Sequence, residues 1–126
     1  MLKVHTQKLG DLIILRLQGR IVNGESVPLV RAVESQPNAS VVVVDLARVS
    51  RIDASGLGVM LKLREQTQSK GVEFRIMNVT KLVDQVLEIT RLNTVFELTS
   101  EVEVRSLASR ARPDEVAKPV SQGLEV

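Results

Sequence analysis

The feature that most constrains the fold is a run of four valines, Val41 to Val44, followed by a polar turn and a helical segment. A valine run bounded by polar residues is typical of a strand buried on both faces of a sheet. The segment from Gly56 to Lys70 has the length and residue types of a helix, and Gly71 is expected to end it. Between them lies Asp53-Ala54-Ser55-Gly56, which we call the motif turn. The motif turn therefore places backbone N–H groups and a hydroxyl at a helix N-terminus, where an anion is favoured.

The chain before the valines predicts a hairpin and a helix. Leu2–Thr6 and Leu12–Leu17 read as two strands, joined by a turn at Gly10-Asp11. Gly19 is expected to end the second strand. A loop follows, and a helix begins with Ser26 as its N-cap and Pro28 in its first turn. Residues 35–38 close this helix.

After Gly71 the chain again alternates strands with helices. Glu73–Val79 alternates as a strand, Thr80 is an N-cap for a third helix, and Val95–Leu98 reads as a short strand. Ser100 and Glu103 have the spacing of a capping box, which starts a fourth helix over residues 101–109.

This order of elements predicts the α/β class. We expect a mixed sheet, with an opening antiparallel pair followed by mostly parallel strands, and about four helices packed on it. The 126 residues suit one domain, which we place at residues 1–109. Residues 110–126 contain few apolar side chains and no period, so we expect a disordered tail.

Composition excludes several function classes. The two signs of charge are interspersed at a net +2, and without Trp or Tyr there are few rings on which bases could stack, so nucleic acid is not expected as a partner. The absence of cysteine removes disulfides and thiolate sites. Neither a signal peptide nor a membrane span is visible. We expect a soluble cytoplasmic protein.

Catalytic machinery is not predicted. His5 is the only histidine, and Ser55 has no evident base to activate it. Asp45 and Asp53 flank one loop, where two carboxylates alone would leave a metal under-coordinated. Gly56-Leu57-Gly58 lacks the third glycine of a dinucleotide fingerprint. We therefore expect neither an enzyme nor a metal or cofactor site.

The motif turn has two interpretations from its residues alone. In the first, Asp53 or Ser55 caps the helix, and Gly56 lets the helix and strand pack closely. In the second, the turn is a working surface. Local chemistry leaves both open.

The segment from Ile52 to Val59, IDASGLGV, resembles the signature turn of the STAS domain, the module of bacterial anti-sigma factor antagonists. The order of elements around it is similar too, including the strand ending at Gly19 and the valine strand ending in Asp45-Leu46. The resemblance covers residues 1–108. It implies the STAS fold and a role in binding a protein partner.

In that family, a motif serine is phosphorylated by a partner that is both kinase and anti-sigma factor. The unphosphorylated antagonist binds this partner and frees a sigma factor, and a phosphatase resets the phosphorylated form. The resemblance implies a contact surface made of two segments, the 23–26 loop and the motif turn: Asn23, Gly24, Glu25, Ser26, Asp53, Ala54, Ser55, Gly56 and Leu57.

The motif departs from the family at its acceptor. The family pattern places the phosphorylated serine directly after the aspartate, where this chain has Ala54. Either Ser55 has taken over the acceptor role or the protein is not switched here. An alternative function is accordingly an unregulated STAS accessory or scaffold module of a larger signalling or lipid-transport assembly. The oligomeric state is not predicted.

Overall fold

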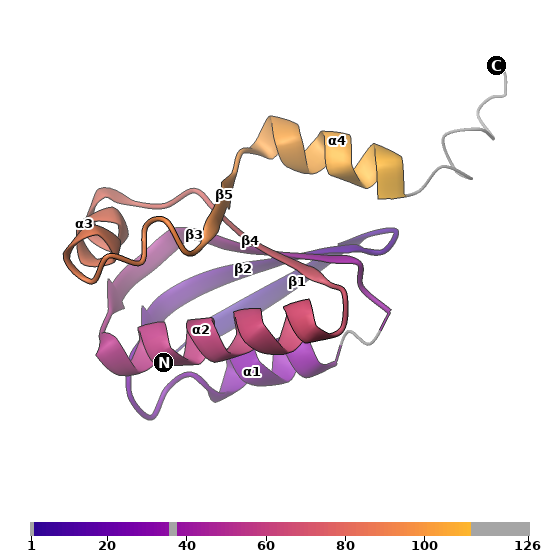
Figure 1. The fold of residues 1–126 in the computed structure, drawn as a ribbon. Coiled ribbons are helices and arrows are strands. Elements are labelled where there is room, and N and C mark those ends of the chain that lie inside the picture. The colour runs from indigo at the N-terminus through magenta and orange to yellow at the C-terminus, as the bar shows by residue number, and fades with distance from the viewer. Residues whose placement is uncertain (1, 36–37, 112–126) are drawn as a thin grey trace, which may run out of the picture.

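The computed structural model describes residues 2–35 and 38–111. Most of the expected tail at 110–126 therefore lies outside the described residues. The described residues form four helices and five strands in this order (Figure 1): β1 (Lys3–Leu9), β2 (Leu12–Ile21), α1 (Val27–Glu34), β3 (Val41–Ile52), α2 (Ala54–Ser69), β4 (Glu73–Met77), α3 (Lys81–Ile89), β5 (Glu97–Thr99) and α4 (Glu101–Ala111).

The strands form one sheet in the order β1-β2-β3-β4-β5. β1 and β2 are antiparallel, and the remaining neighbours are parallel. The opening hairpin turns at Gly10, whose φ of 69° lies in the left-handed region that glycine adopts readily. The sheet confirms the predicted α/β class with an antiparallel pair followed by parallel strands.

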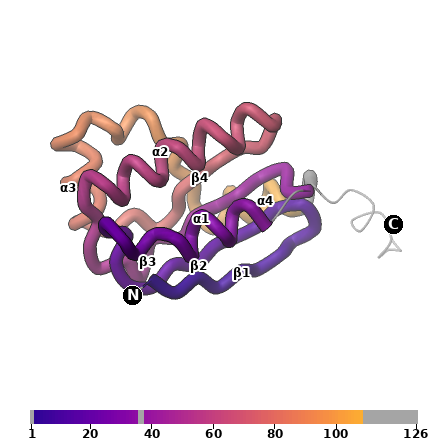
Figure 2. The backbone as a smooth tube through the Cα atoms, turned by 90° about the horizontal axis from the view of Figure 1, so that it is seen from below, coloured from indigo at the N-terminus to yellow at the C-terminus, as the bar shows by residue number. Residues whose placement is uncertain are grey.

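Helices cover the two faces of the sheet unequally. α1 and α2 lie side by side across one face (Figures 1 and 2), and buried residues of α3 join the same core. Of the helices described, α4 alone lies on the opposite face (Figure 1), where buried Val104 packs over the sheet. The described residues therefore cover the second face only in part.

The valine run shows why both faces must be covered. Side chains alternate between the faces of a strand. Val42 and Val44 enter the core under α1, α2 and α3, whereas Val41 and Val43 join the smaller cluster under α4. All four side chains are at most 6% exposed, as a doubly buried strand predicts.

Several predicted strand ends were wrong: β1 ends at Leu9 rather than Thr6, β4 ends at Met77 rather than Val79, and β2 and β3 run further than expected. β2 continues beyond Gly19 to Ile21, because Gly19 adopts a φ of 120° and its pairing with β3 shifts register there instead of stopping. β3 likewise continues beyond Leu46 as far as Ile52. Bulges of this kind add a residue to one strand and bend it without ending the sheet.

Helix starts were predicted more closely. Thr80 accepts a hydrogen bond from the Val83 N–H, and Ser100 and Glu103 form the reciprocal pair of a capping box. α2 begins at Ala54, two residues before the predicted Gly56. Ser26 occupies the N-cap position of α1, but its side chain accepts no cap hydrogen bond, and its hydroxyl donates to the carbonyl of Val22.

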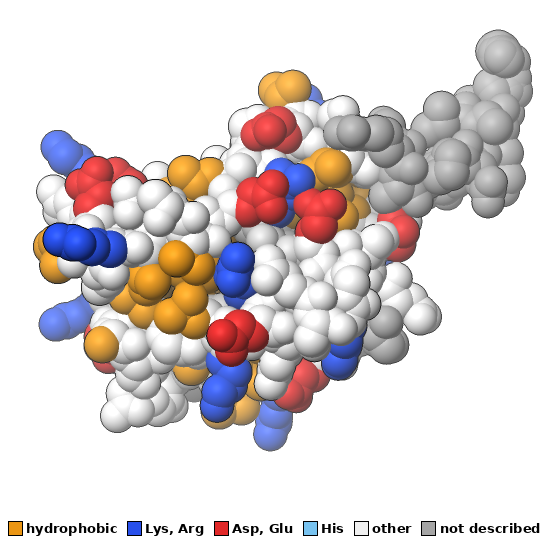
Figure 3. All heavy atoms as spheres, in the orientation of Figure 1, with side chains coloured by type: hydrophobic (Ala, Val, Ile, Leu, Met, Phe, Trp, Pro, Cys, Tyr) orange, Lys and Arg blue, Asp and Glu red, His pale blue; other side chains and the backbone are white. Residues whose placement is uncertain are grey.

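One face of the molecule carries hydrophobic side chains between α2 and α3, bordered by intermixed acidic and basic residues (Figure 3). Half-exposed hydrophobic residues of these elements pack against the main core, among them Val59 and Val86. This surface belongs to the edge of the core rather than to a separate cluster.

Candidate partner-binding site

The Asp53 carboxylate organises the motif turn. Asp53 is the N-cap of α2, in an extended conformation, and its Oδ1 accepts a hydrogen bond of 2.8 Å from the Gly56 N–H. Its Oδ2 accepts a second bond of 3.2 Å from the N–H of Asn23. One carboxylate thus ties the start of α2 to the loop between β2 and α1.

These hydrogen bonds stabilise the ionised carboxylate. The Gly56 N–H, and next the Asn23 N–H, lower the pKa of Asp53 below its ordinary value. The motif turn therefore carries a fixed negative charge at neutral pH, beside the positive end of the α2 dipole.

Ser55 lies exposed on the first turn of α2, at the second helical residue. Within residues 2–35 and 38–111, its hydroxyl has no hydrogen-bond partner. Ala54, one residue earlier, is also exposed. Asp53 therefore caps the helix as the first local interpretation expects, while the Ser55 hydroxyl stays accessible and uncommitted.

The loop of residues 22–26, between β2 and α1, lies against the motif turn, and its residues differ in how exposed they are. Asn23 and Gly24 are exposed, and Gly24 has a φ of 81° with open space where a side chain would be. Glu25 is half-buried and forms an ion pair of 2.7 Å with Arg20. Ser26 is only 8% exposed.

The nine residues expected at the contact surface thus fall into two groups. Six are exposed or half-buried around the Asp53 carboxylate: Asn23, Gly24, Glu25, Asp53, Ala54 and Ser55. Three are buried beneath them: Ser26, Gly56 and Leu57. The buried three hold the loop and the helix in place and offer little surface to a partner.

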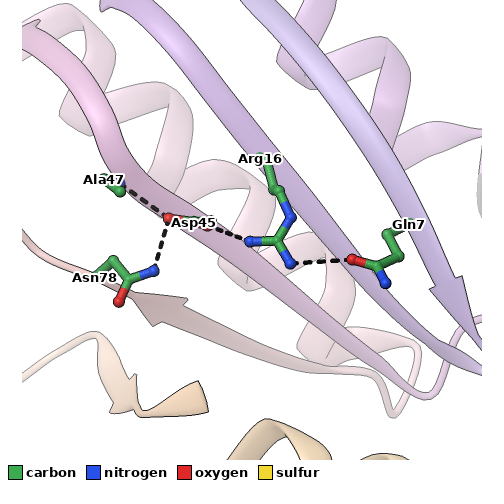
Figure 4. Close-up of polar contacts among 5 residues, drawn as sticks. All are labelled: Gln7, Arg16, Asp45, Ala47 and Asn78. Carbon is green, nitrogen blue, oxygen red and sulfur yellow. Dashed lines mark hydrogen bonds and ion pairs between the residues drawn. The ribbon is translucent and has the colours of Figure 1, made fainter.

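Asp45 and Asp53 do not form a pair. Asp45 lies inside β3, where its side chain points to the α4 face and accepts hydrogen bonds from Arg16, the Ala47 N–H and Asn78 (Figure 4). The sequence analysis did not identify this cluster. The sequence nevertheless indicated such a cluster, because a carboxylate directly after four buried valines requires hydrogen-bond partners.

In the described part of the chain, no group of three His, Cys, Asp or Glu side chains could hold a metal ion. Of the helices described, none has the length and apolar character needed to cross a membrane.

The chain matches one family model and aligns with solved structures of known proteins. A family model for the STAS domain matches residues 3–104. SpoIIAA, an anti-sigma factor antagonist, aligns in its unphosphorylated form with a TM-score of 0.67 at 18% identity, over 88% of this chain and 97% of that one. Its phosphorylated form, from Bacillus, aligns with a TM-score of 0.64 at 15% identity, over 82% and 97%.

Two other solved structures are similar to this chain, a sulfate transporter family protein and Mglu. A sulfate transporter family protein from Wolinella succinogenes aligns with a TM-score of 0.65 at 17% identity, over 82% of this chain and 88% of that one. Mglu aligns with a TM-score of 0.53 at 30% identity over 57% of this chain. The present chain spans only 18% of the length of Mglu.

Proposed function

This chain belongs to the STAS domain family, and on that basis we propose that it is an anti-sigma factor antagonist. It binds an anti-sigma factor that is also a serine kinase, and the binding frees a sigma factor. Phosphorylation of Ser55 ends the binding, and a phosphatase restores it. The protein acts in the cytoplasm, where sigma factors work, and is not itself an enzyme.

The observation that carries this proposal is the exposed Ser55 hydroxyl on a turn fixed by Asp53. Because Asp53 bonds both α2 and the 22–26 loop, a partner meets the two segments in one fixed arrangement. A surface that is ordered before binding loses less entropy on association. The likeness to SpoIIAA, solved in phosphorylated and unphosphorylated forms, supports the same use.

A phosphate on Ser55 would change binding without refolding the domain. It adds about 1.5 to 2 negative charges, which the N-terminus of α2 tolerates. In a closed interface the same charges would need desolvating and would repel the Asp53 carboxylate. A loss of about 3 kcal/mol in binding free energy corresponds to roughly a hundredfold in affinity.

The position of the phosphorylated serine determines the direction in which its hydroxyl points toward the kinase. Successive helical residues are rotated by about 100° around the axis, since the helix has 3.6 residues per turn. The Ser55 hydroxyl therefore points about 100° away from the direction of the Ala54 side chain. The kinase proposed here must accept this rotated serine.

The test uses a kinase-type anti-sigma factor from the source cell. Wild type, Ser55→Ala and Ser55→Asp are titrated against it, and the wild type is incubated with the kinase and ATP and mapped by mass spectrometry. We expect phosphate on Ser55, unchanged affinity for Ser55→Ala and about a hundredfold weaker binding for Ser55→Asp. Equal affinities with no phosphate on Ser55 would rule out the switch.

Ala54 favours a second function, an unregulated STAS module in a larger signalling or transport assembly. The residue occupies the family's acceptor position, and a sulfate transporter family protein shares the fold. Purification of the tagged chain from its own cells separates the two functions. Recovery of a kinase-type anti-sigma factor supports the first, and recovery of transporter subunits supports the second.

A further inference from the structure

The sheet face that carries α4 has an open half, and this half is basic. α4 packs over Leu12, Ile14, Val41, Val43 and Met77, which lie toward one end of the strands. Beyond them, β1, β2 and β3 continue, and no helix within residues 2–35 and 38–111 lies above them. We call this surface the basic half-face and define it by seven residues: Lys3, His5, Arg16, Gln18, Arg20, Arg48 and Arg51.

The strand pairing brings these residues onto one face. Leu17 and Ile21 of β2 enter the main core, so the residues that alternate with them, Arg16, Gln18 and Arg20, point to the opposite face. Cross-strand neighbours then lie side by side, and these pairs are His5 with Arg16, Lys3 with Gln18, Gln18 with Arg48, and Arg20 with Arg51. Three strands therefore contribute cations to one continuous surface.

The surface is hollowed at its centre. A concavity of about 280 Å³ is lined by residues of the three strands: His5, Arg16, Leu17, Gln18, Asp45, Ala47 and Arg48. A chain in extended conformation that crossed the strands would find both apolar and polar atoms there. The hollow gives the charged surface a shape that a flat basic patch lacks.

Among the described residues that line this hollow, Asp45 is the one carboxylate, and an ion pair already balances its charge. The Asp45 side chain is 7% exposed and lies 2.7 Å from the Arg16 guanidinium, while its other oxygen accepts from the Ala47 N–H and from Asn78 (Figure 4). Gln7 accepts from the same guanidinium and holds it in place. Asp45 therefore does not cancel the charges around it.

Three cations on the basic half-face remain uncompensated. Arg20 is paired with Glu25, as Arg16 is with Asp45. Among the residues that the structure describes, Lys3, Arg48 and Arg51 form no ion pair. Glu101 of α4 lines a separate hollow, on the α4 side of Arg16. The field above β2 and β3 therefore favours an anion.

We infer that the basic half-face is a docking surface for an acidic segment of a partner protein. Charge complementarity selects the sign of the partner, and the hollow between three strands suits a peptide carrying spaced carboxylates. Gln18 adds an amide group with both a donor and an acceptor for a peptide backbone.

The same face is poorly suited to a nucleic acid or a membrane. Proteins that bind single-stranded nucleic acid combine a basic groove with aromatic rings on which bases stack, and here both phenylalanines, Phe74 and Phe96, are buried in the main core. Binding to a membrane surface is strengthened by apolar side chains that insert beside the basic residues. The exposed large hydrophobic residues lie on helices and on β5 instead: Val27, Leu82, Ile89, Leu98 and Val102.

This surface is independent of the proposed switch, because it lies on the sheet and not on the motif turn. Arg51 nevertheless comes two residues before Asp53 in the sequence. A partner that held the motif turn could therefore place an acidic segment on the basic half-face at the same time.

The test measures a labelled peptide of alternating glutamate and serine by fluorescence anisotropy at low and at physiological salt. We expect salt-dependent binding to wild type and a loss of about tenfold or more in Arg48→Glu/Arg51→Glu. The matched control, Lys62→Glu/Lys70→Glu, makes the same charge change at exposed positions in and just after α2 and should bind within about twofold of wild type. Arg48→Gln/Arg51→Gln provides a milder variant should the double reversal impair folding.

Three outcomes would overturn the inference. Wild type could fail to bind the peptide at low salt, or the control could lose as much affinity as the variant on the sheet. In the third, an oligothymidine or a phosphatidylglycerol vesicle would bind more tightly than the peptide and displace it. None of these measurements uses the kinase partner, so the result does not depend on the proposed switch.

Discussion

Gly56 lies against the backbone of Ile21 so closely that a Cβ on Gly56 would stand 1.9 Å from the Ile21 carbonyl oxygen and 2.7 Å from its carbonyl carbon. The first turn of α2 therefore packs on the end of β2 through main-chain atoms. This contact sets the position of Ser55 relative to the 22–26 loop, because Ile21 leads directly into that loop.

Gly56→Ala should destabilise the domain by about 3 kcal/mol or more. Real Cβ contacts are essentially never shorter than 3.0 Å, and the atoms in the way are backbone rather than a movable side chain. The helix must shift away from β2, which also separates Asp53 from Asn23. Urea unfolding of the variant gives the loss of free energy.

Gly58→Ala is the matched control on the same helix. A Cβ at Gly58 meets nothing within 4 Å, and alanine favours a helix interior by roughly 0.5 to 1 kcal/mol over glycine. We expect Gly58→Ala to be as stable as wild type or more so. If both variants lost the same stability, the close contact with Ile21 would not be the cause.

Asp53 should make stability depend on pH in the acid range. Its pKa is lower in the folded protein than its ordinary value of about 4, because the Gly56 and Asn23 N–H groups bond the ionised form. The stabilisation is complete above that ordinary value and is lost as the pH falls through the folded-state pKa. Comparing unfolding free energies of wild type and Asp53→Asn from neutral to acid pH measures it.

The difference in stability between wild type and Asp53→Asn should change with pH in one direction. Wild type should exceed Asp53→Asn in stability at neutral pH, and the difference should shrink as the pH falls below about 4. Asparagine is itself a good N-cap, so the variant keeps a capped helix without a titrating group. A difference that stayed constant with pH would contradict the assigned role of the carboxylate.

Local sequence signals predicted much of this fold because each had one structural explanation. The valine run predicted a strand covered on both faces, and its side chains are buried in the two core clusters. The Ser100–Glu103 spacing predicted a capping box, and the two residues form one. The motif turn was predicted as a strand-to-helix junction, and Asp53 was among the two residues considered as its cap.

The remaining features depended on tertiary contacts. Gly19 reads as a strand end, yet pairing with Val49 of β3 carries β2 past it. Ser26 has the residue type of an N-cap, but its hydroxyl bonds Val22. The Arg16–Asp45 pair joins residues 29 positions apart, and its place on the α4 face follows from strand register, which no local pattern specifies.

Asp45→Ala should destabilise the domain by about 2 kcal/mol. The change leaves the Ala47 N–H and the Asn78 amide without their acceptor, and hydrogen bonds to a charged group contribute about 1.5 to 3 kcal/mol. Arg16→Ala should cost less, about 1 kcal/mol, because the Arg16 side chain is 43% exposed and Asp45 keeps its other two donors. Chemical denaturation of both variants checks the order, and a larger loss for Arg16→Ala would contradict it.

Val104 should be the residue that holds α4 on the sheet. It is 3% exposed and packs with Leu12, Ile14 and Met77, whereas Val102 on the same helix is 74% exposed. Val104→Ala removes two buried methyl groups and should cost about 2 kcal/mol, because each buried methylene contributes roughly 0.8 kcal/mol and a cavity remains. Val102→Ala should change stability by less than about 0.5 kcal/mol, as is usual for surface substitutions. Unfolding free energies test the pair, and hydrogen exchange should show faster exchange in α4 of Val104→Ala alone. Equal losses in the two variants would mean that α4 is not anchored through this face.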